Sequence, residues 1–151
     1  MRKQYESEDD LSNERIVMER ACDIWKCQYH KLPYSYHLDF ALTQNDRIKS
    51  FAEVKARNME WGQYPDIMIS MSKFLWAKNI DKAMGVDTLL IVWAKKDDEI
   101  VWCKLNDVYI PGDSLRYGGR TVQRRDEQDV EPVVHIRNNN FQKLKNILHT
   151  K

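Results

Sequence analysis

The chain has 151 residues, a hydrophobic fraction of 42% and 24 basic against 23 acidic residues, which leaves a formal net charge of +1. This length predicts a single domain, residues 1–151, with enough apolar residues for one core. The near-neutral charge provides no bulk attraction for nucleic acid, so any basic surface must be local. The longest apolar run, residues 89–94, is too short to span a bilayer, and we expect no membrane partner.

The chain contains three cysteines, at positions 22, 27 and 103. An odd number without a Cys-x-x-Cys motif argues against a disulfide framework or a zinc knuckle, and favours a reduced, cytoplasmic setting. Cys22 and Cys27 are five residues apart on an expected helix, so they are not expected to share a face. Residues 1–10 are acidic and lack the apolar core of a signal peptide, which predicts a flexible tail.

A first helix is predicted over residues 12–30. Its apolar stripe runs through Val17, Ala21 and Ile24, and proline at position 33 ends it. Glu14 lies at the end of this inward stripe and Glu19 lies off it.

Residues 36–57 predict two strands joined by a hairpin. Apolar residues alternate with Asp39 in the first strand, the turn follows at residues 44–46, and Glu53 and Lys55 share one face of the second strand. If the strands pair in register, Asp39 faces the same surface from the neighbouring strand. The hairpin is therefore expected to bring two carboxylates and one lysine together.

Two adjacent carboxylates repel each other, and each resists ionising beside the other. The arrangement becomes favourable when a divalent cation lies between them, and oxygen ligands suit Mg²⁺ or Mn²⁺. A lysine beside the pair can hold a phosphate oxygen or the attacking water. Asp39, Glu53 and Lys55 thus have the chemistry of metal-assisted phosphodiester hydrolysis.

Asp39 followed by Glu53-Val54-Lys55 resembles the signature of the PD-(D/E)XK nuclease superfamily, which includes restriction enzymes, junction resolvases and phage nucleases. Leu38 stands where the family usually has proline. Pro65-Asp66 is not the motif, because no Glu-x-Lys or Asp-x-Lys follows at a comparable distance. The alternative interpretation of Glu53-Val54-Lys55 taken alone is an ordinary solvent-exposed face of a strand.

The resemblance implies Mg²⁺ (or Mn²⁺) held by Asp39, Glu53 and the Val54 carbonyl, with Lys55 orienting the water and no organic cofactor. It also implies an acidic residue from the first helix. On the stripe geometry this role goes to Glu14, with Glu19 in reserve, and the alternative is a glutamate that only complements the helix dipole. DNA is the implied partner, and analogy with phage-type resolvases implies a homodimer, phage-encoded and acting in the host cytoplasm.

Further along the chain, Arg57 shares the face of Lys55 and would clamp a phosphate or form a surface ion pair. A third strand is predicted over residues 64–71. Ser72 is expected to cap a helix that starts at Lys73 and stops at Gly85. Lys73 contacts phosphate in this hypothesis and is a plain surface lysine in the alternative. Strands follow over 88–94 and 99–105.

Residues 114–125 hold four arginines and no acid. Gly118-Gly119 predicts a two-residue hairpin turn that would present Arg116, Arg120 and Arg124 to DNA, or would simply keep the ribbon soluble. A short strand over 133–136 and a closing helix with an apolar face at Phe141, Leu144, Ile147 and Leu148 complete the chain.

The fold class expected is α/β, with a restriction-endonuclease-like αβββαβ core over residues 12–105 and a mixed central sheet flanked by helices. Residues 106–151 add a C-terminal hairpin and a short helix. The expected function is that of a structure-selective or resolvase-type endodeoxyribonuclease. Two alternatives stay open: a catalytically inactive nucleic-acid-binding or scaffold protein on this fold, and a metal-independent RNA endonuclease using Tyr36, His37 and Lys55.

Overall fold

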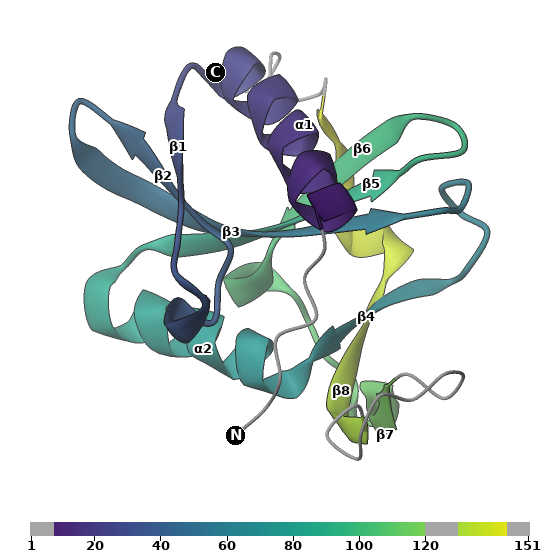
Figure 1. Ribbon diagram of the computed structural model, residues 1–151. Coiled ribbons are helices and arrows are strands. Elements are labelled where there is room, and N and C mark those ends of the chain that lie inside the picture. Colours follow the sequence, from purple (N-terminus) through teal and green to yellow (C-terminus); the bar gives the residue numbers. More distant parts are fainter. Residues whose placement is uncertain (1–7, 120–129, 145–151) are drawn as a thin grey trace.

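The computed structural model describes residues 8–119 and 130–144. Figure 1 shows a long twisted sheet with helix α1 on one face and helix α2 on the other. This α/β arrangement, a mixed sheet between helices, confirms the expected restriction-endonuclease-like fold class. Its elements are α1 (Glu8–Trp25), β1 (Gln28–Lys31), β2 (Phe40–Gln44), β3 (Arg47–Arg57), β4 (Asp66–Ser70), α2 (Met71–Met84), β5 (Asp87–Ala94), β6 (Glu99–Lys104), β7 (Leu115–Gly119), β8 (Val130–Arg137) and β9 (Gln142–Lys143).

The larger sheet has the strand order β1-β2-β3-β5-β6-β9. Strands β3 and β5 are parallel and the remaining pairs are antiparallel. The parallel pair requires a crossover, and β4 and α2 supply it. Strand β4 does not join this sheet, as a simple meander would require, but pairs with β8 in a second sheet of order β4-β8-β7.

The larger sheet separates two apolar clusters. On one face, Phe40, Ala52 and Val54 pack against α1, whose buried residues are Val17, Met18, Ala21 and Cys22. On the other face, Leu90 and Val92 pack against residues of α2 and the second sheet, among them Ile69, Ala77 and Val134. Strand β5 is buried on both faces, as its continuous apolar sequence predicts for a central strand.

Helix α1 starts earlier and ends earlier than its sequence pattern indicates. It begins at Glu8, with three acids in its first turn, where carboxylates complement the helix dipole. It ends at Trp25, and Lys26 takes a left-handed conformation with φ of 58°. Residues 28–31 then form strand β1, so the expected helix to residue 30 was wrong, and residues 8–10 are helical where a tail was expected. Residues 1–7 lie outside the described chain.

The turn after helix α1 also brings two cysteines together. The Cys27 N–H donates to the Cys22 carbonyl over 3.2 Å, and the two sulfur atoms lie 3.3 Å apart. The expectation that these thiols lie apart was wrong, because Cys27 follows the end of the helix and its position is set by the turn. Both thiols are free.

The hairpin of β2 and β3 forms as the sequence indicates. Asn45 and Asp46 both take left-handed conformations, as a two-residue turn of the primed type requires. Phe40 pairs with Ala52, and the Asp39 N–H donates to the Ala52 carbonyl over 3.2 Å. This register places Asp39 beside Glu53.

Helix α2 begins at Met71 and not at Lys73. Ser70 is its N-cap, because the Ser70 hydroxyl accepts the Ser72 N–H. Gly85 ends the helix in a left-handed conformation with φ of 66°, as expected.

The C-terminal part differs most from expectation. Gly118 and Gly119 lie within strand β7 and pair with Glu131 and Val130, so they are not a hairpin turn. Phe141 follows the 3-10 turn Asn138–Asn140, and residues 142–143 form β9, so no helix starts there. Arg120, Arg124, Ile147 and Leu148 lie outside the described residues. In the described part of the chain, no helix is long and apolar enough to cross a bilayer.

Substitutions at two glycines test why helix α2 ends at Gly85. A Cβ added at Gly85 or at Gly112 would meet no atom within 4 Å, but only Gly85 has a positive φ. Gly85→Ala should therefore lower the free energy of unfolding by about 1 kcal/mol, because an L-residue is strained in the left-handed region. Gly112→Ala should leave it unchanged or slightly raised. Urea unfolding followed by circular dichroism measures both, and equal effects would contradict the conformational explanation.

Candidate active site

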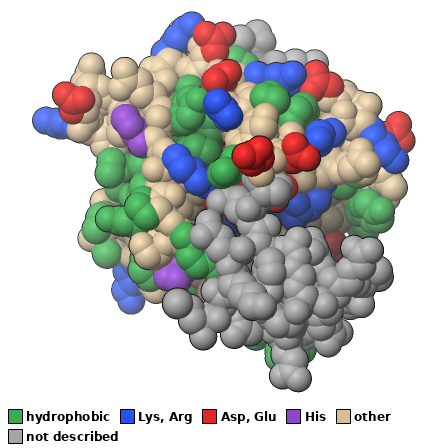
Figure 2. Space-filling model, viewed as in Figure 1, with side chains coloured by type: hydrophobic (Ala, Val, Ile, Leu, Met, Phe, Trp, Pro, Cys, Tyr) green, Lys and Arg blue, Asp and Glu red, His purple; other side chains and the backbone are tan. Residues whose placement is uncertain are grey.

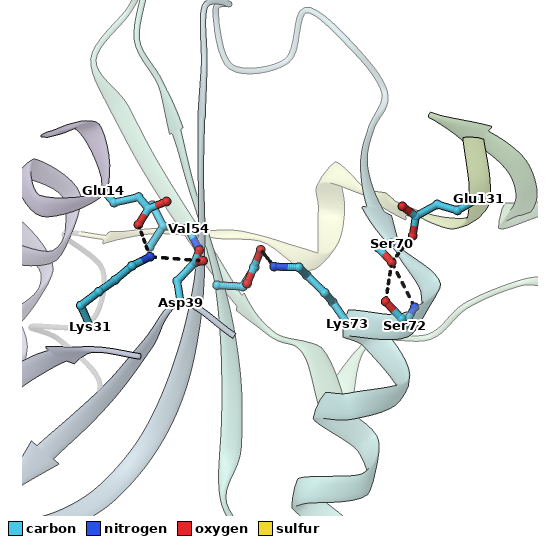
Figure 3. Close-up of polar contacts among 9 residues, drawn as sticks. Glu14, Lys31, Asp39, Val54, Ser70, Ser72, Lys73 and Glu131 are labelled. Carbon is cyan, nitrogen blue, oxygen red and sulfur yellow. Dashed lines mark hydrogen bonds and ion pairs between the residues drawn. The ribbon is translucent and has the colours of Figure 1, made fainter. Parts of the chain in front are cut away.

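The carboxylates of Asp39 and Glu53 lie next to each other. Asp39 directly precedes β2, and Glu53 lies on β3. Glu53 is 3% exposed, and the Asp39 side chain is 15% exposed. Figure 3 shows Glu14 and Lys31 on one side of Asp39 and Lys73 of α2 on the other. The group therefore draws side chains from α1, β1, the β2–β3 hairpin and α2.

Glu53 is the most deeply buried acid of the group. Its Oε2 accepts a hydrogen bond from Lys73 Nζ at 2.5 Å, and its Oε1 is buried with no hydrogen-bond partner among the described residues. Burial raises the pKa of Glu53, and the charge of Asp39 raises it further, while Lys73 and Lys55 act in the opposite direction. A buried carboxylate oxygen without a partner is costly, and a cation would satisfy it.

Asp39 is held by the backbone of the neighbouring strand. Its Oδ2 accepts the Val54 N–H at 2.9 Å, and Lys31 Nζ lies 3.8 Å from its Oδ1. The hydrogen bond from Val54 fixes the carboxylate beside Glu53. A charge-assisted bond of this kind is stronger than a neutral one.

Glu14 reaches the group through Lys31. Lys31 Nζ lies 2.8 Å from Glu14 Oε1, and the Glu14 side chain is 12% exposed. Glu19 instead accepts a hydrogen bond from the Tyr29 hydroxyl at 3.4 Å. The arrangement therefore places Glu14 rather than Glu19 near Asp39, and a role for Glu14 in the reaction stays a prediction.

Two further lysines lie beside the acids. Burial lowers the pKa of Lys55, against the opposing attraction of Glu53. Burial also disfavours the charged form of Lys73, but the charges of Glu53 and Asp39 outweigh it and raise the pKa of Lys73. The pKa values of these two lysines are therefore shifted in opposite directions.

The donor set fits one hard cation. Within the described residues there is no cluster of three or more His, Cys, Asp or Glu side chains placed to hold a metal ion. Mg²⁺ commonly takes only one or two protein carboxylates and completes its shell with water and substrate phosphate. Asp39 and the unpartnered Oε1 of Glu53 are two carboxylates of this kind, and the Val54 carbonyl as a further ligand stays a prediction.

The other predicted contact residues are spread more widely. Arg57 is exposed at the end of β3, and its guanidinium donates to the Ala56 carbonyl over 3.2 Å. Arg116 is exposed on β7 in the second sheet and donates to the Asp113 carbonyl over 3.4 Å. Figure 2 shows Lys and Arg side chains scattered among acidic ones over the face that it draws.

Two aromatic contacts bear on the alternatives. The His37 ring lies against Trp76, with ring centroids 5.0 Å apart. Trp61 packs edge-on against Phe141 at 5.3 Å, so packing accounts for it.

Sequence reasoning missed Lys31, which the expected helix end concealed. Lys31 pairs with Phe40, and the Leu32 N–H donates to the Asp39 carbonyl over 2.8 Å. Recognising residues 28–31 as a strand beside β2 would have placed Lys31 next to Asp39. The missing signal was the partner strand, because Gln28 also fits the spacing of the preceding helix.

Lys73 should stabilise the fold through Glu53. Lys73→Met would leave a buried carboxylate without its cation, and we expect a loss of about 1–3 kcal/mol in the free energy of unfolding. In a Glu53→Gln background the same change should cost much less, since the buried charge is gone. Lys104→Met is the control, because Lys104 pairs with a more exposed aspartate, Asp87, at 3.4 Å. Equal losses in the two backgrounds, measured in urea, would show that the pair is not coupled.

Comparison with known proteins supports the family and the fold. Residues 1–144 match the family described as "Phage putative PDDEXK endonuclease". The solved structure of Hjc, a Holliday junction resolvase from the archaeal hyperthermophile Archaeoglobus fulgidus, has the same fold. It shows a TM-score of 0.53 and 10% sequence identity over 93% of this chain and 98% of that chain. No curated protein matches the sequence. The match over residues 1–144 shows that this chain belongs to the phage PD-(D/E)XK endonuclease family.

Proposed function

We propose that this protein is a Mg²⁺- or Mn²⁺-dependent endonuclease that hydrolyses DNA phosphodiester bonds, of structure-selective or junction-resolving type. One observation carries the proposal. Asp39 and Glu53 lie side by side, and the buried Oε1 of Glu53 has no partner among the described residues. A protein that only bound nucleic acid would gain nothing from this costly arrangement.

Each residue has a separate task in the proposed reaction. Asp39, Glu53 and the Val54 carbonyl hold the cation, and the Val54 N–H fixes the orientation of Asp39. When bound, the cation would neutralise charge on the scissile phosphate and lower the pKa of a bound water. Lys55, whose pKa burial lowers, orients that water from the same strand face as Glu53. Lys73 opposes the rise in the pKa of Glu53 and holds its Oε2 in place.

DNA as substrate is inferred from the family and from the cations near the centre. Arg57 follows Lys55 on the same strand face and is exposed, so it can contact a neighbouring phosphate. Arg116 would contact DNA farther from the cut, and Arg120 and Arg124, which the sequence predicts for the same role, lie outside the described residues. We infer a homodimer by analogy with phage-type resolvases, since two sites would cut two strands, and action in the cytoplasm of the host cell.

Cleavage assays test the site assignment. Asp39→Asn, Glu53→Gln and Lys55→Met should each lower the rate in Mg²⁺ by about 100-fold or more, because each removes a group that acts on the transition state. Asp66→Asn is the matched control: this aspartate also follows a proline-containing loop, but it pairs with His135 at 2.9 Å in the second sheet. Linear, nicked, single-stranded and four-way-branched DNA identify the preferred substrate.

Circular dichroism must show that the variants stay folded. Full cleavage by Glu53→Gln or Lys55→Met would overturn the assignment. Cleavage that persists in EDTA would instead favour the metal-independent alternative with Tyr36, His37 and Lys55. The contact of His37 with Trp76 gives no support to that alternative.

Metal binding can be measured without any substrate. Mn²⁺ at about 100 times its dissociation constant should stabilise the folded protein by about 2.7 kcal/mol and raise the melting temperature by several degrees. Asp39→Asn should abolish most of this shift, because it removes one ligand and one charge. Differential scanning calorimetry with Mn²⁺ and with EDTA measures it. An equal shift in the variant would place the metal elsewhere.

A further inference from the structure

Lys31 is a partly exposed lysine next to the acids of the candidate site. Its ammonium group lies 2.8 Å from Glu14 Oε1 and 3.8 Å from Asp39 Oδ1. Figure 3 shows this lysine between the two acids, with Glu14 coming from α1 and Lys31 from β1. Lys31 thus bridges two carboxylates that come from different elements.

Lysine side chains already face the acids of the group without any metal ion. Lys31 lies beside Glu14 and Asp39, and Lys73 lies beside Glu53. A divalent cation beside Asp39 and Glu53 would add two positive charges next to these lysines. The nearest ammonium groups would then be repelled, and a lysine that borders on solvent has room to move away.

Lys31 is the more exposed of the two lysines that form ion pairs with these acids. Lys73 is 28% exposed and hydrogen-bonded to the buried Glu53, whereas the Lys31 side chain is 39% exposed. Lys31 is the last residue of β1, the edge strand of the larger sheet. Its ammonium lies 5.1 Å from the centroid of the Phe40 ring, so the stem crosses an apolar surface and can pivot toward solvent.

We propose that Lys31 is a displaceable counterion that becomes a phosphate contact. In the metal-free protein it neutralises Glu14 and Asp39. When the cation binds, Lys31 leaves Asp39 and its charge becomes available to a phosphate of the DNA. This inference rests on the proposed function, because it requires a metal at Asp39 and Glu53. It assigns to Lys31 a role distinct from that of Lys55 or Lys73.

Metal titration without DNA provides the first test. Lys31→Met should bind Mn²⁺ about two- to tenfold more tightly than the unchanged protein, because the competing positive charge is gone. Lys31→Arg keeps the charge and should bind Mn²⁺ about as tightly as the unchanged protein. Lys104→Met removes an equally exposed lysine that pairs with Asp87 and should change nothing. Isothermal titration calorimetry measures all four proteins.

DNA binding provides the second test. With Ca²⁺ in place of Mg²⁺, Lys31→Met should bind four-way-branched DNA more weakly, and the slope of log affinity against log salt should fall in magnitude by about one. Fluorescence anisotropy measures the affinity, and a denaturing gel checks that the DNA stays intact. Lys104→Met should keep the full slope.

The outcomes separate the possible roles. Tighter Mn²⁺ binding together with a reduced salt slope supports the proposal. Weaker Mn²⁺ binding by Lys31→Met would overturn it and show that Lys31 positions Glu14 for the metal. Unchanged Mn²⁺ affinity or an unchanged salt slope would also overturn it. If the unchanged protein binds no Mn²⁺ at all, the proposed metal-dependent function itself fails, which is a different result.

Discussion

The repulsion between Asp39 and Glu53 is the constraint on which this site depends. The hairpin register places them side by side, and burial of Glu53 makes its ionised form still more costly. The fold offsets that cost with lysines from separate elements: Lys31 from β1 and Lys73 from α2. In the proposed function, a bound cation would offset the same repulsion between the two carboxylates.

The architecture explains how these lysines reach the acids. Helix α1 and strand β1 approach the hairpin from one side, and the crossover from β3 to β5 brings the start of α2 to the other side. Ser70 caps α2 and so fixes where Lys73 begins its first turn. The crossover that makes β3 and β5 parallel therefore also brings the ammonium group of Lys73 to Glu53.

The family match and the solved resolvase structure support different statements about this protein. The family match places the chain among phage endonucleases. The resemblance to the archaeal resolvase, at 10% identity, concerns the fold alone. A proposal about the chemistry must therefore rest on the residues of the site. The second sheet, with Arg116 on β7, lies outside the larger sheet that carries Glu53.

The local sequence was sufficient to predict Asp39, Glu53 and Lys55 as neighbours, and the tertiary structure decided which residues surround them. Alternation along a strand has a period of two, so the shared face of Glu53 and Lys55, and the turn before them, can be read from adjacent residues. The expected helix at residues 28–30 failed because β1 is defined by hydrogen bonds to β2, and Gln28 also suits a helical stripe. The pairings of Lys31 with Asp39 and of Lys73 with Glu53, and the separate sheet containing β4, join residues distant in sequence or in different elements. No local periodicity encodes such contacts, because they arise only when the layers pack.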